Sequence, residues 1–240
     1  MEILALILSI IIAFFAFITL GLSGFGSSLV MVPLMLLFLD IKLVVPATLI
    51  LNVISCTIIA IHSRSFVKKK YLISLAIGGL TGAIVGTYFL ATFENIILKK
   101  IYGIIVILFA LNTLFPKIEL KSSNKIYGVF SGLIAGLFGA IYQTGGPPIV
   151  IYLSYQIRKK EVLRATMLAF WVILDLWILF LYLNSGLINN SVINFSLILL
   201  PSLILGIILG SKIHHKINEC LFKKIIGIIL VFTGMILVLF

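Results

Sequence analysis

The chain has 240 residues, of which 62% are hydrophobic and only 10% are charged, and its mean hydropathy is +1.31. So few polar residues cannot cover the surface of a soluble globular protein of this length, which excludes that class and predicts a polytopic membrane protein. The net charge of +11 does not indicate a nucleic-acid partner, because the basic residues lie in short loops between apolar runs, where they orient membrane proteins.

The apolar runs predict an all-α membrane protein that forms one polytopic domain over residues 1–240. In hydrocarbon every backbone polar group must be satisfied internally, and the runs lack the alternation of barrel strands. Met1 and Glu2 lead directly into apolar sequence without a basic segment, so the start is interpreted as mature protein.

The first apolar run is too long to be one membrane helix. From Ile3 to Leu39 it has 37 residues without an ionisable side chain, which as a helix would be about 55 Å long, against a hydrocarbon core of roughly 30 Å. We expect the chain to turn back at GLSGFGSS, residues 21–28, where glycines permit unusual backbone angles, and we expect Pro33 to interrupt the helix that follows.

The same pattern occurs once more in the second half. The run from Ile126 to Ile157 has 32 uncharged residues and is broken at QTGGPP, residues 143–148. The other apolar runs are close to twenty residues each, a length that predicts one membrane helix apiece. They cover residues 43–62, 72–91, 97–115, 163–183, 192–211 and 222–240.

Internal similarity predicts a duplicated module. Residues 99–105 read KKIYGII and residues 223–229 read KKIIGII, so six of seven positions recur 124 places apart. At that offset Gly82 and Gly86 recur as Gly206 and Gly210, and at offset 115 Gly21, Leu22, Gly24 and Pro33 recur as Gly136, Leu137, Gly139 and Pro148. We predict repeat 1 at about 1–116 and repeat 2 at about 124–240, each with one broken or re-entrant helical hairpin and three transmembrane helices, giving 8 to 10 membrane segments.

The distribution of lysine and arginine predicts that the two repeats are inverted. If each broken hairpin returns to the side that it left, fifteen Lys and Arg residues lie inside and three outside; if each hairpin crosses once, the count is seven against eleven. Basic loops stay in the cytoplasm, so the first arrangement is favoured. It makes the repeats antiparallel and brings their hairpin turns toward a shared central region.

The two turns are the candidate substrate site. Helix N-termini carry exposed N–H groups that bind anions without a cation, and neighbouring hydroxyl or amide groups add donors. Tight packing by Gly and Pro is the alternative explanation of the turns, and interhelical hydrogen bonding explains Asn52 equally well. The predicted substrate-binding residues are Ser23, Gly24, Ser27, Ser28, Asn52, Gln143, Thr144 and Gly145.

Asp175 is the only acidic residue deep inside a predicted span. Burying an ionised carboxylate at this depth is costly, so the group should be protonated, paired or beside water. Our hypothesis is that Asp175 couples transport to protons by loading and unloading one, and the alternative is a neutral carboxyl that is hydrogen-bonded to a neighbouring helix.

Four stretches carry a resemblance to a known family. They are GLSGFGSSLVMVPLMLL at 21–37, IHSRSFVKKK at 61–70, GGLTGAIVG at 78–86 followed by LKKIYGIIVIL at 98–108, and GLFGAIYQTGGPPIVIYL at 136–153. In their order and duplication they resemble the sulfite exporter TauE/SafE family of membrane permeases over essentially the whole chain. This resemblance implies movement of sulfite, sulfoacetate and related anions across the cytoplasmic membrane. Ser27 and Ser28 stand where that family commonly has glycine.

These observations predict a secondary transporter of small anions, with export of sulfite, an organosulfonate or a related anion by alternating access. The alternatives are an importer of another small solute and a membrane-embedded protein that does not transport. We expect no enzyme activity, cofactor, metal site or catalytic residue. His62, His214 and His215 lie at the ends of spans, and the separation of Cys56 from Cys220 is not that of metal-ligating cysteines. The expected partners are the anion and the lipid bilayer of the cell membrane, without nucleic acid. The sequence leaves open whether the chain forms a homo-oligomer.

Overall fold

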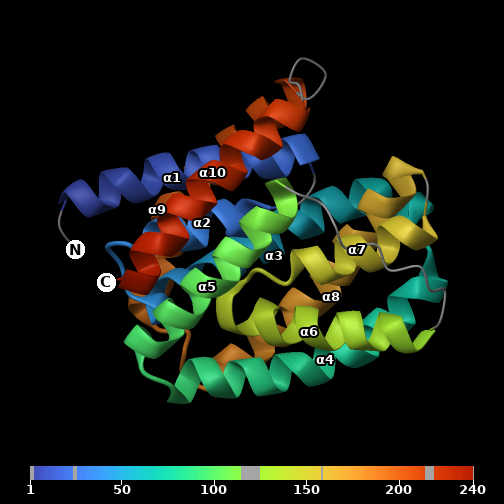
Figure 1. Ribbon diagram of the computed structural model, residues 1–240, viewed down its shortest axis with the longest axis horizontal. Helices are drawn as coiled ribbons and strands as arrows, with labels where there is room; N and C mark the ends of the chain where they lie inside the picture. Colours follow the sequence, from blue (N-terminus) through green and yellow to red (C-terminus); the bar gives the residue numbers. More distant parts are fainter. Residues whose placement is uncertain (1–2, 24–25, 115–124, 158, 214–218, 240) are drawn as a thin grey trace. The chain divides into compact units, whose positions relative to one another are not determined.

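The computed structural model describes residues 3–23, 26–114, 125–157, 159–213 and 219–239. Every regular element in these residues is helical (Figure 1), so the prediction of an all-α protein is confirmed. In chain order the elements are α1 (Ile3–Ser23), α2 (Ser27–Met35), α3 (Ile41–Ser63), a short 3-10 helix (Arg64–Phe66), α4 (Lys69–Thr92), α5 (Asn95–Leu114), α6 (Lys125–Tyr142), α7 (Gly146–Gln156), α8 (Lys160–Asn184), α9 (Asn190–Ile213) and α10 (Glu219–Leu239).

Each of the predicted plain spans is a helix with bounds within a few residues of those expected. Five helical segments in the described residues are long and apolar enough to cross a bilayer. They are Ile3–Leu22, Ile41–Ile61, Lys69–Thr92, Glu161–Asn184 and Asn190–Lys212. The shorter segments Ile126–Tyr142 and Gly227–Leu239 are also apolar, so the chain is a multi-pass membrane protein.

Both long apolar runs break where glycines and prolines cluster. The first run splits into α1 and α2, and the second into α6 and α7. The second arms have 9 and 11 residues, about 14 and 17 Å as helix, which is about half of the hydrocarbon thickness. Neither arm can cross the bilayer alone.

Pro33 lies inside α2, which continues for two more residues and ends at Met35. The expectation that the helix is interrupted at Pro33 itself is therefore wrong.

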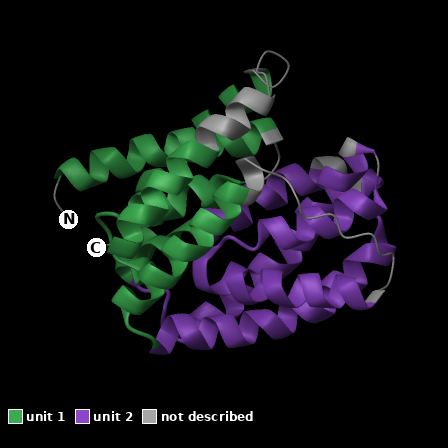
Figure 2. Cartoon of the chain, viewed as in Figure 1, with its two compact units in different colours: residues 1–48, 93–117, 190–240 green, residues 49–92, 118–189 purple. Residues whose placement is uncertain are grey.

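The chain divides into two compact units, coloured in Figure 2. Unit 1 contains residues 1–48, 93–117 and 190–240, and unit 2 contains residues 49–92 and 118–189. The boundary falls within α3. Each unit therefore combines helices from both halves of the sequence and does not follow the predicted repeat bounds. The inverted repeat and the number of membrane segments stay predictions.

Unit 1 is built on glycine contacts between helices that are distant in sequence. α1 packs along α9, and a Cβ added at Gly210 would lie 2.4 Å from the backbone oxygen of Ile18. α5 packs along α10, where a Cβ at Gly103 would lie 2.8 Å from the oxygen of Gly234. Any larger residue would separate these backbones, so packing is the role of these glycines.

Unit 2 is built on the same kind of contact between α4 and α6 (Figure 1). A Cβ at Gly82 would lie 2.1 Å from the oxygen of Leu133, and one at Gly136 would lie 2.0 Å from the oxygen of Gly79. Glycines spaced by four on α4 and α6 therefore let the backbones of these two helices approach closely.

The contacts of α1 with α9 resemble those of α4 with α6, but the matching contacts differ by one helical turn from those that the sequence offsets of 115 and 124 predict. Gly206 of α9 lies against the carbonyl of Phe14 in α1. The residue of α6 that matches Phe14 at offset 115 is Val129, and its carbonyl lies against Gly78, not against Gly82. The offsets of 115 and 124 therefore relate the two helix pairs with a difference of one helical turn, and the equivalence of Gly82 with Gly206 stays a prediction.

Lys99 of α5 stabilises the end of α2 within unit 1. Its Nζ donates hydrogen bonds to the backbone oxygens of Leu36 at 2.8 Å and Leu39 at 2.7 Å. Leu36 is the C-cap of α2, and the last carbonyls of a helix have no intrahelical partner and carry partial negative charge, so the ammonium group complements the helix dipole there. The bond to Leu39 holds the turn that follows α2.

We expect Lys99→Met to keep the length of the side chain and to lose both bonds. The loss should cost about 1 to 2 kcal/mol for this half-buried group, a fall of roughly 2 to 8 °C in melting temperature for a chain of this size. The measurement is thermal unfolding of the detergent-purified protein. Lys100→Met, one residue along on the exposed side of α5, is the matched control, and equal melting temperatures for the two variants would contradict the assignment.

Candidate functional site

The break between α6 and α7 is formed by an unusual backbone. α6 ends at Tyr142, and Gln143 has φ 57°, the only positive φ of a non-glycine residue in the part of the chain that the structure describes. Gly145, with φ −74° and ψ 5°, is the N-cap of α7. A left-handed glutamine is uncommon and costs free energy, so contacts around it must maintain the turn.

The side chain of Gln143 supplies those contacts. Its Oε1 accepts a hydrogen bond of 3.1 Å from Nδ2 of Asn52 on α3, and its Nε2 donates one of 3.0 Å to the oxygen of Gly139. The backbone N–H of Gln143 also donates to the oxygen of Gly139, at 2.9 Å. The amide therefore joins α3 to the end of α6 and holds the turn in place.

The N-terminus of α7 keeps backbone donors that no side chain caps. Pro147 and Pro148 have no N–H group, so Gly145 and Gly146 carry the backbone donors among the first four positions. The two glycines have different surroundings. A Cβ at Gly145 would lie 2.1 Å from the oxygen of Ala135, whereas one at Gly146 would meet nothing within 4 Å. There is thus open space directly at the first residue of α7.

Thr144 adds a hydroxyl group to this turn. Its side chain is 1% exposed, and its Oγ1 has no hydrogen-bond partner among the described residues. A buried polar atom without a partner costs about 1 to 3 kcal/mol, and such an atom in a native structure calls for an explanation. A ligand at the start of α7 would provide the missing partner.

Asp175 is also part of unit 2, on α8, and is 3% exposed. Cys56 on α3 and Tyr182 on α8 lie within the range over which ionised side chains would interact electrostatically with it. Tyr182 lies two turns along the same face of α8, and its hydroxyl donates a hydrogen bond to the oxygen of Ala140. No hydrogen bond to Asp175 itself is formed by the described residues. Tyr182 therefore links the face of α8 that carries Asp175 to the last turn of α6.

The break between α1 and α2 belongs to unit 1. Gly26 precedes α2 with φ 95°, and a Cβ there would meet nothing within 4 Å. Ser27 and Ser28 are the first two residues of α2 and are 3% and 8% exposed. Ser23 is the last residue of α1, but its side chain and the whole of Gly24 lie outside the described residues. The meeting of the two turns stays a prediction.

The arrangement in unit 2 has the chemistry of an anion site without a cation. It offers two glycine N–H groups at the positive end of a helix, one hydroxyl without a partner, and open space beside them. Such termini bind sulfate-like and carboxylate groups by hydrogen bonds and by the helix dipole. The structure brings together Asn52, Gln143, Thr144 and Gly145, four of the predicted residues, around this turn.

Comparison with known protein families decides the membership of the chain. The family model described as Sulfite exporter TauE/SafE matches residues 9–237. The chain belongs to this family. The resemblance in the sequence is confirmed, and the TauE/SafE assignment makes the protein a member of a family of membrane transporters of sulfur-containing anions. Comparisons with curated proteins and with solved structures gave no match.

The match to the TauE/SafE model includes both breaks, but three residues near the site of this transporter were not predicted from the sequence. Gly146 stands beside the predicted Gly145 in the same motif, and only its open surroundings distinguish it. Tyr182 could have been found from its spacing of seven residues from Asp175, which places both on one helix face. Cys56 carries no such signal, since its proximity to Asp175 joins residues that are far apart in the sequence.

Proposed function

We propose that this TauE/SafE protein is a secondary transporter that exports a small sulfur-containing anion, such as sulfite or an organosulfonate, across the cell membrane by alternating access. Family membership supports the class of substrate. A secondary mechanism is supported by the sequence, which contains no nucleotide-binding loop of the GxxxxGK[ST] type. Broken helices with short second arms are typical of the substrate sites of such transporters.

The observation that carries the proposal is the unpartnered hydroxyl of Thr144 next to the open start of α7. In the proposed site the anion accepts hydrogen bonds from the N–H groups of Gly145 and Gly146 and from Oγ1 of Thr144. Gln143 and Asn52 act through the turn by holding its backbone, which makes them positioning residues. Charge-assisted hydrogen bonds of this kind replace part of the water shell of the anion.

The start of α2 is a second candidate contact for the anion. It has an open glycine at its N-cap and two buried serines in its first turn. Ser27 and Ser28 have polar interactions within the protein, so their hydroxyl groups would have to exchange partners to bind substrate. We therefore assign the α7 start as the principal anion-binding element.

We expect Thr144→Val to weaken binding of the anion while preserving the fold. Valine has the shape of threonine but lacks the hydroxyl group, and a hydrogen bond to a charged ligand is worth about 1.5 to 3 kcal/mol. The predicted result is an apparent KM for sulfite that rises roughly 10- to 150-fold. Flux into liposomes measures it, with melting temperature as the check on folding. Thr144→Ser, which keeps the hydroxyl, should transport nearly normally, and a Val variant with unchanged KM would remove Thr144 from the site.

The function itself is tested with the purified protein in liposomes. Uptake and release of labelled sulfite, an organosulfonate and sulfate are followed with and without an imposed pH gradient, and in both directions. We expect saturable flux of at least one sulfur-containing anion and competition among them. If none of these anions moves faster than through protein-free liposomes, the transport proposal is wrong.

A further inference from the structure

A second anion site is indicated at the other end of α7, where a cavity of about 390 Å³ opens in unit 2. We call it the lysine pocket. Lys68 lines it from the loop before α4, and Lys70 and Tyr71 from the first turn of α4. Ile157, the C-cap of α7, Lys159, the N-cap of α8, and Val162 in the first turn of α8 complete this part of the lining. Since α7 runs from Gly146 to Gln156, the lysine pocket is about 15 Å from the start of α7.

The walls of the lysine pocket are fixed by hydrogen bonds. The backbone N–H of Lys68 donates to Oγ1 of Thr166 at 3.1 Å, and the hydroxyl of Thr166 donates to the oxygen of Val162 at 2.7 Å. Thr166 is fully buried. These two bonds join the loop before α4 to the first turns of α8, so the two charged walls face the same cavity before any ligand arrives.

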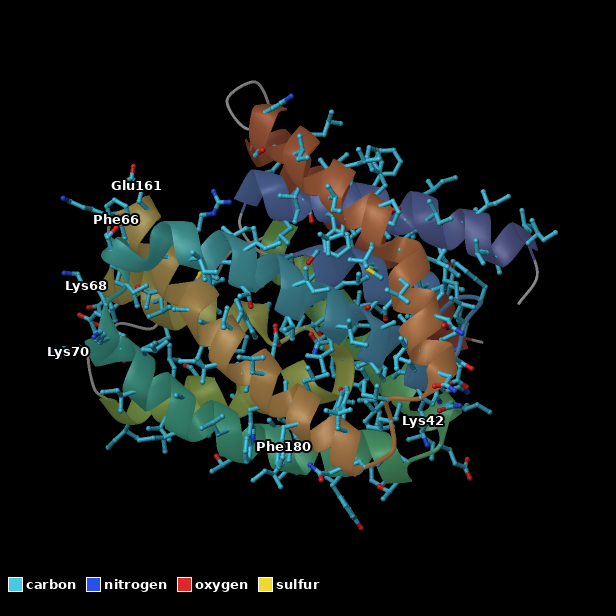
Figure 3. All side chains as sticks on the ribbon, turned by 180° about the vertical axis from the view of Figure 1, so that it is seen from behind. Lys42, Phe66, Lys68, Lys70, Glu161 and Phe180 are labelled. Carbon is cyan, nitrogen blue, oxygen red and sulfur yellow. The ribbon has the colours of Figure 1, made fainter. Side chains whose placement is uncertain are left out.

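The electrostatics of the lysine pocket favour an anion. Three lysines line it, and the starts of two long helices, α4 and α8, lie beside it, whose N-termini add partial positive charge. Lys159 is the N-cap of α8 and its side chain forms no cap hydrogen bond. Figure 3 shows Lys68, Lys70 and Glu161 at the same end of the unit. Glu161 is the only acidic residue in the first turn of either helix, so positive charge remains in excess.

The lining of the lysine pocket also has an apolar and aromatic part, which we call its floor and which is formed by Tyr71, Ile157 and Val162. Nζ of Lys70 lies 5.8 Å from the centre of the Tyr71 ring, and that ring meets the ring of Tyr152 edge to face, with centres 6.5 Å apart. Ile157 is 7% exposed. A cationic rim over an apolar floor suits an amphiphilic anion, such as a phospholipid whose phosphate contacts the lysines and whose glycerol and acyl carbons contact the floor.

We propose that the lysine pocket is a binding site for a phosphate-type oxyanion, separate from the transport site at the start of α7. Two sources carry this chemistry, namely the headgroup of an anionic phospholipid and a free oxyanion in water. Membrane proteins use pockets of basic residues near the cytoplasmic surface to hold anionic headgroups, and the apolar floor favours the lipid. Its role would be to hold the starts of α4 and α8 together, because one headgroup bridges both.

Stabilisation by added ligand tests the proposal on the full-length protein in detergent. The probes are phosphatidylglycerol, phosphatidylcholine as the lipid without net charge, and inorganic phosphate, each titrated while the melting temperature is recorded. The pocket variant is Lys70→Gln with Lys159→Gln. The matched control is Lys69→Gln with Lys212→Gln, which removes the same charge from exposed lysines that do not line the pocket.

We expect phosphatidylglycerol to raise the melting temperature of the wild type and of the control, and to bind the pocket variant about thirtyfold more weakly. Phosphatidylcholine should have little effect on any of them. A shift with inorganic phosphate that the pocket variant loses would identify a free oxyanion as the occupant. If the pocket variant responds to each probe as the control does, the lysine pocket binds no such ligand. Because the readout is binding, the result is independent of whether the protein transports sulfite.

Discussion

Gly145→Ala is expected to destroy the turn between α6 and α7, and Gly146→Ala is expected to leave it intact while impairing transport. A methyl group at Gly145 would lie 2.1 Å from the oxygen of Ala135 and 2.8 Å from its carbonyl carbon. These are backbone atoms of α6, which cannot rotate away as a flexible side chain could. The helix and the turn must separate, at a cost of about 3 kcal/mol or more.

The same methyl group at Gly146 meets nothing within 4 Å. Gly146 is the first residue of α7, a position where alanine is allowed, and replacing glycine there restricts the unfolded chain slightly. The methyl group would, however, occupy the space in front of the N–H groups that we assign to the anion. We therefore expect the substitution at Gly145 to lower stability and the substitution at Gly146 to lower transport without lowering stability.

The measurements are melting temperature in detergent and flux into liposomes for both variants. We expect the Gly145 variant to melt roughly 6 to 12 °C lower than the wild type and to lose transport with its fold. We expect the Gly146 variant to melt at or slightly above the wild-type temperature and to transport at least tenfold more slowly at low substrate concentration. A stable Gly146 variant with wild-type flux would mean that the anion does not bind at this helix start.

The positions of the helices and of their two breaks could be predicted because each depends on local sequence. Uncharged runs of 37 and 32 residues exceed what one membrane helix needs, and glycine and proline mark where such a run can turn. The site residues Gln143, Thr144 and Gly145 follow from that turn. Family membership was likewise visible in short motifs with a fixed order.

The helix partners could not be predicted, because lipid removes the usual signal. In a soluble protein the apolar face of a helix points to its neighbours, whereas in a membrane both the lipid and the neighbouring helices are apolar. Gly82 and Gly210 therefore indicate that another helix approaches closely, but they do not identify that helix. The pairing of α4 with α6 and of α1 with α9 joins residues far apart in sequence. The one-turn shift between Gly78 and Gly82 has the same origin, since packing, not residue identity, decides which glycine meets the neighbour.

Roles that depend on hydrogen bonding were also beyond the sequence. Gln143 was predicted as a direct donor to substrate, and in the structure its amide is bonded to Asn52 and Gly139. A contact between Gln143 and the anion stays a prediction. Thr144 was predicted on equal terms, yet its hydroxyl has no hydrogen-bond partner in the part of the chain that the structure describes. Gln143 and Thr144 thus have different proposed roles, positioning and anion binding, because the side chain of Gln143 is hydrogen-bonded within the fold.

Asp175→Asn is expected to separate transport from the proton gradient. Asparagine has nearly the shape of aspartate, so packing in α8 is preserved, but it cannot bind and release a proton. An ionised carboxylate at membrane depth is costly unless it is paired or hydrated, and within the described residues no hydrogen bond reaches Asp175. A carboxyl that is 3% exposed and lacks a dedicated partner fits a group that exchanges a proton better than one that only joins two helices.

The test uses an organosulfonate as substrate, because its charge does not change with pH, whereas that of sulfite does. For the wild type we expect accumulation in liposomes to change by about tenfold per pH unit and per coupled proton. The Asn variant should carry the anion only down its own gradient, at a rate that the imposed pH gradient does not alter.

Cys56→Ala is the matched control for Asp175→Asn. It removes a buried neighbour of Asp175 and leaves the carboxyl in place, so the response to the pH gradient should persist. Retention of that response in the Asn variant would show that Asp175 serves packing alone. Its loss in both variants would show that the response does not depend on the proton of Asp175 alone.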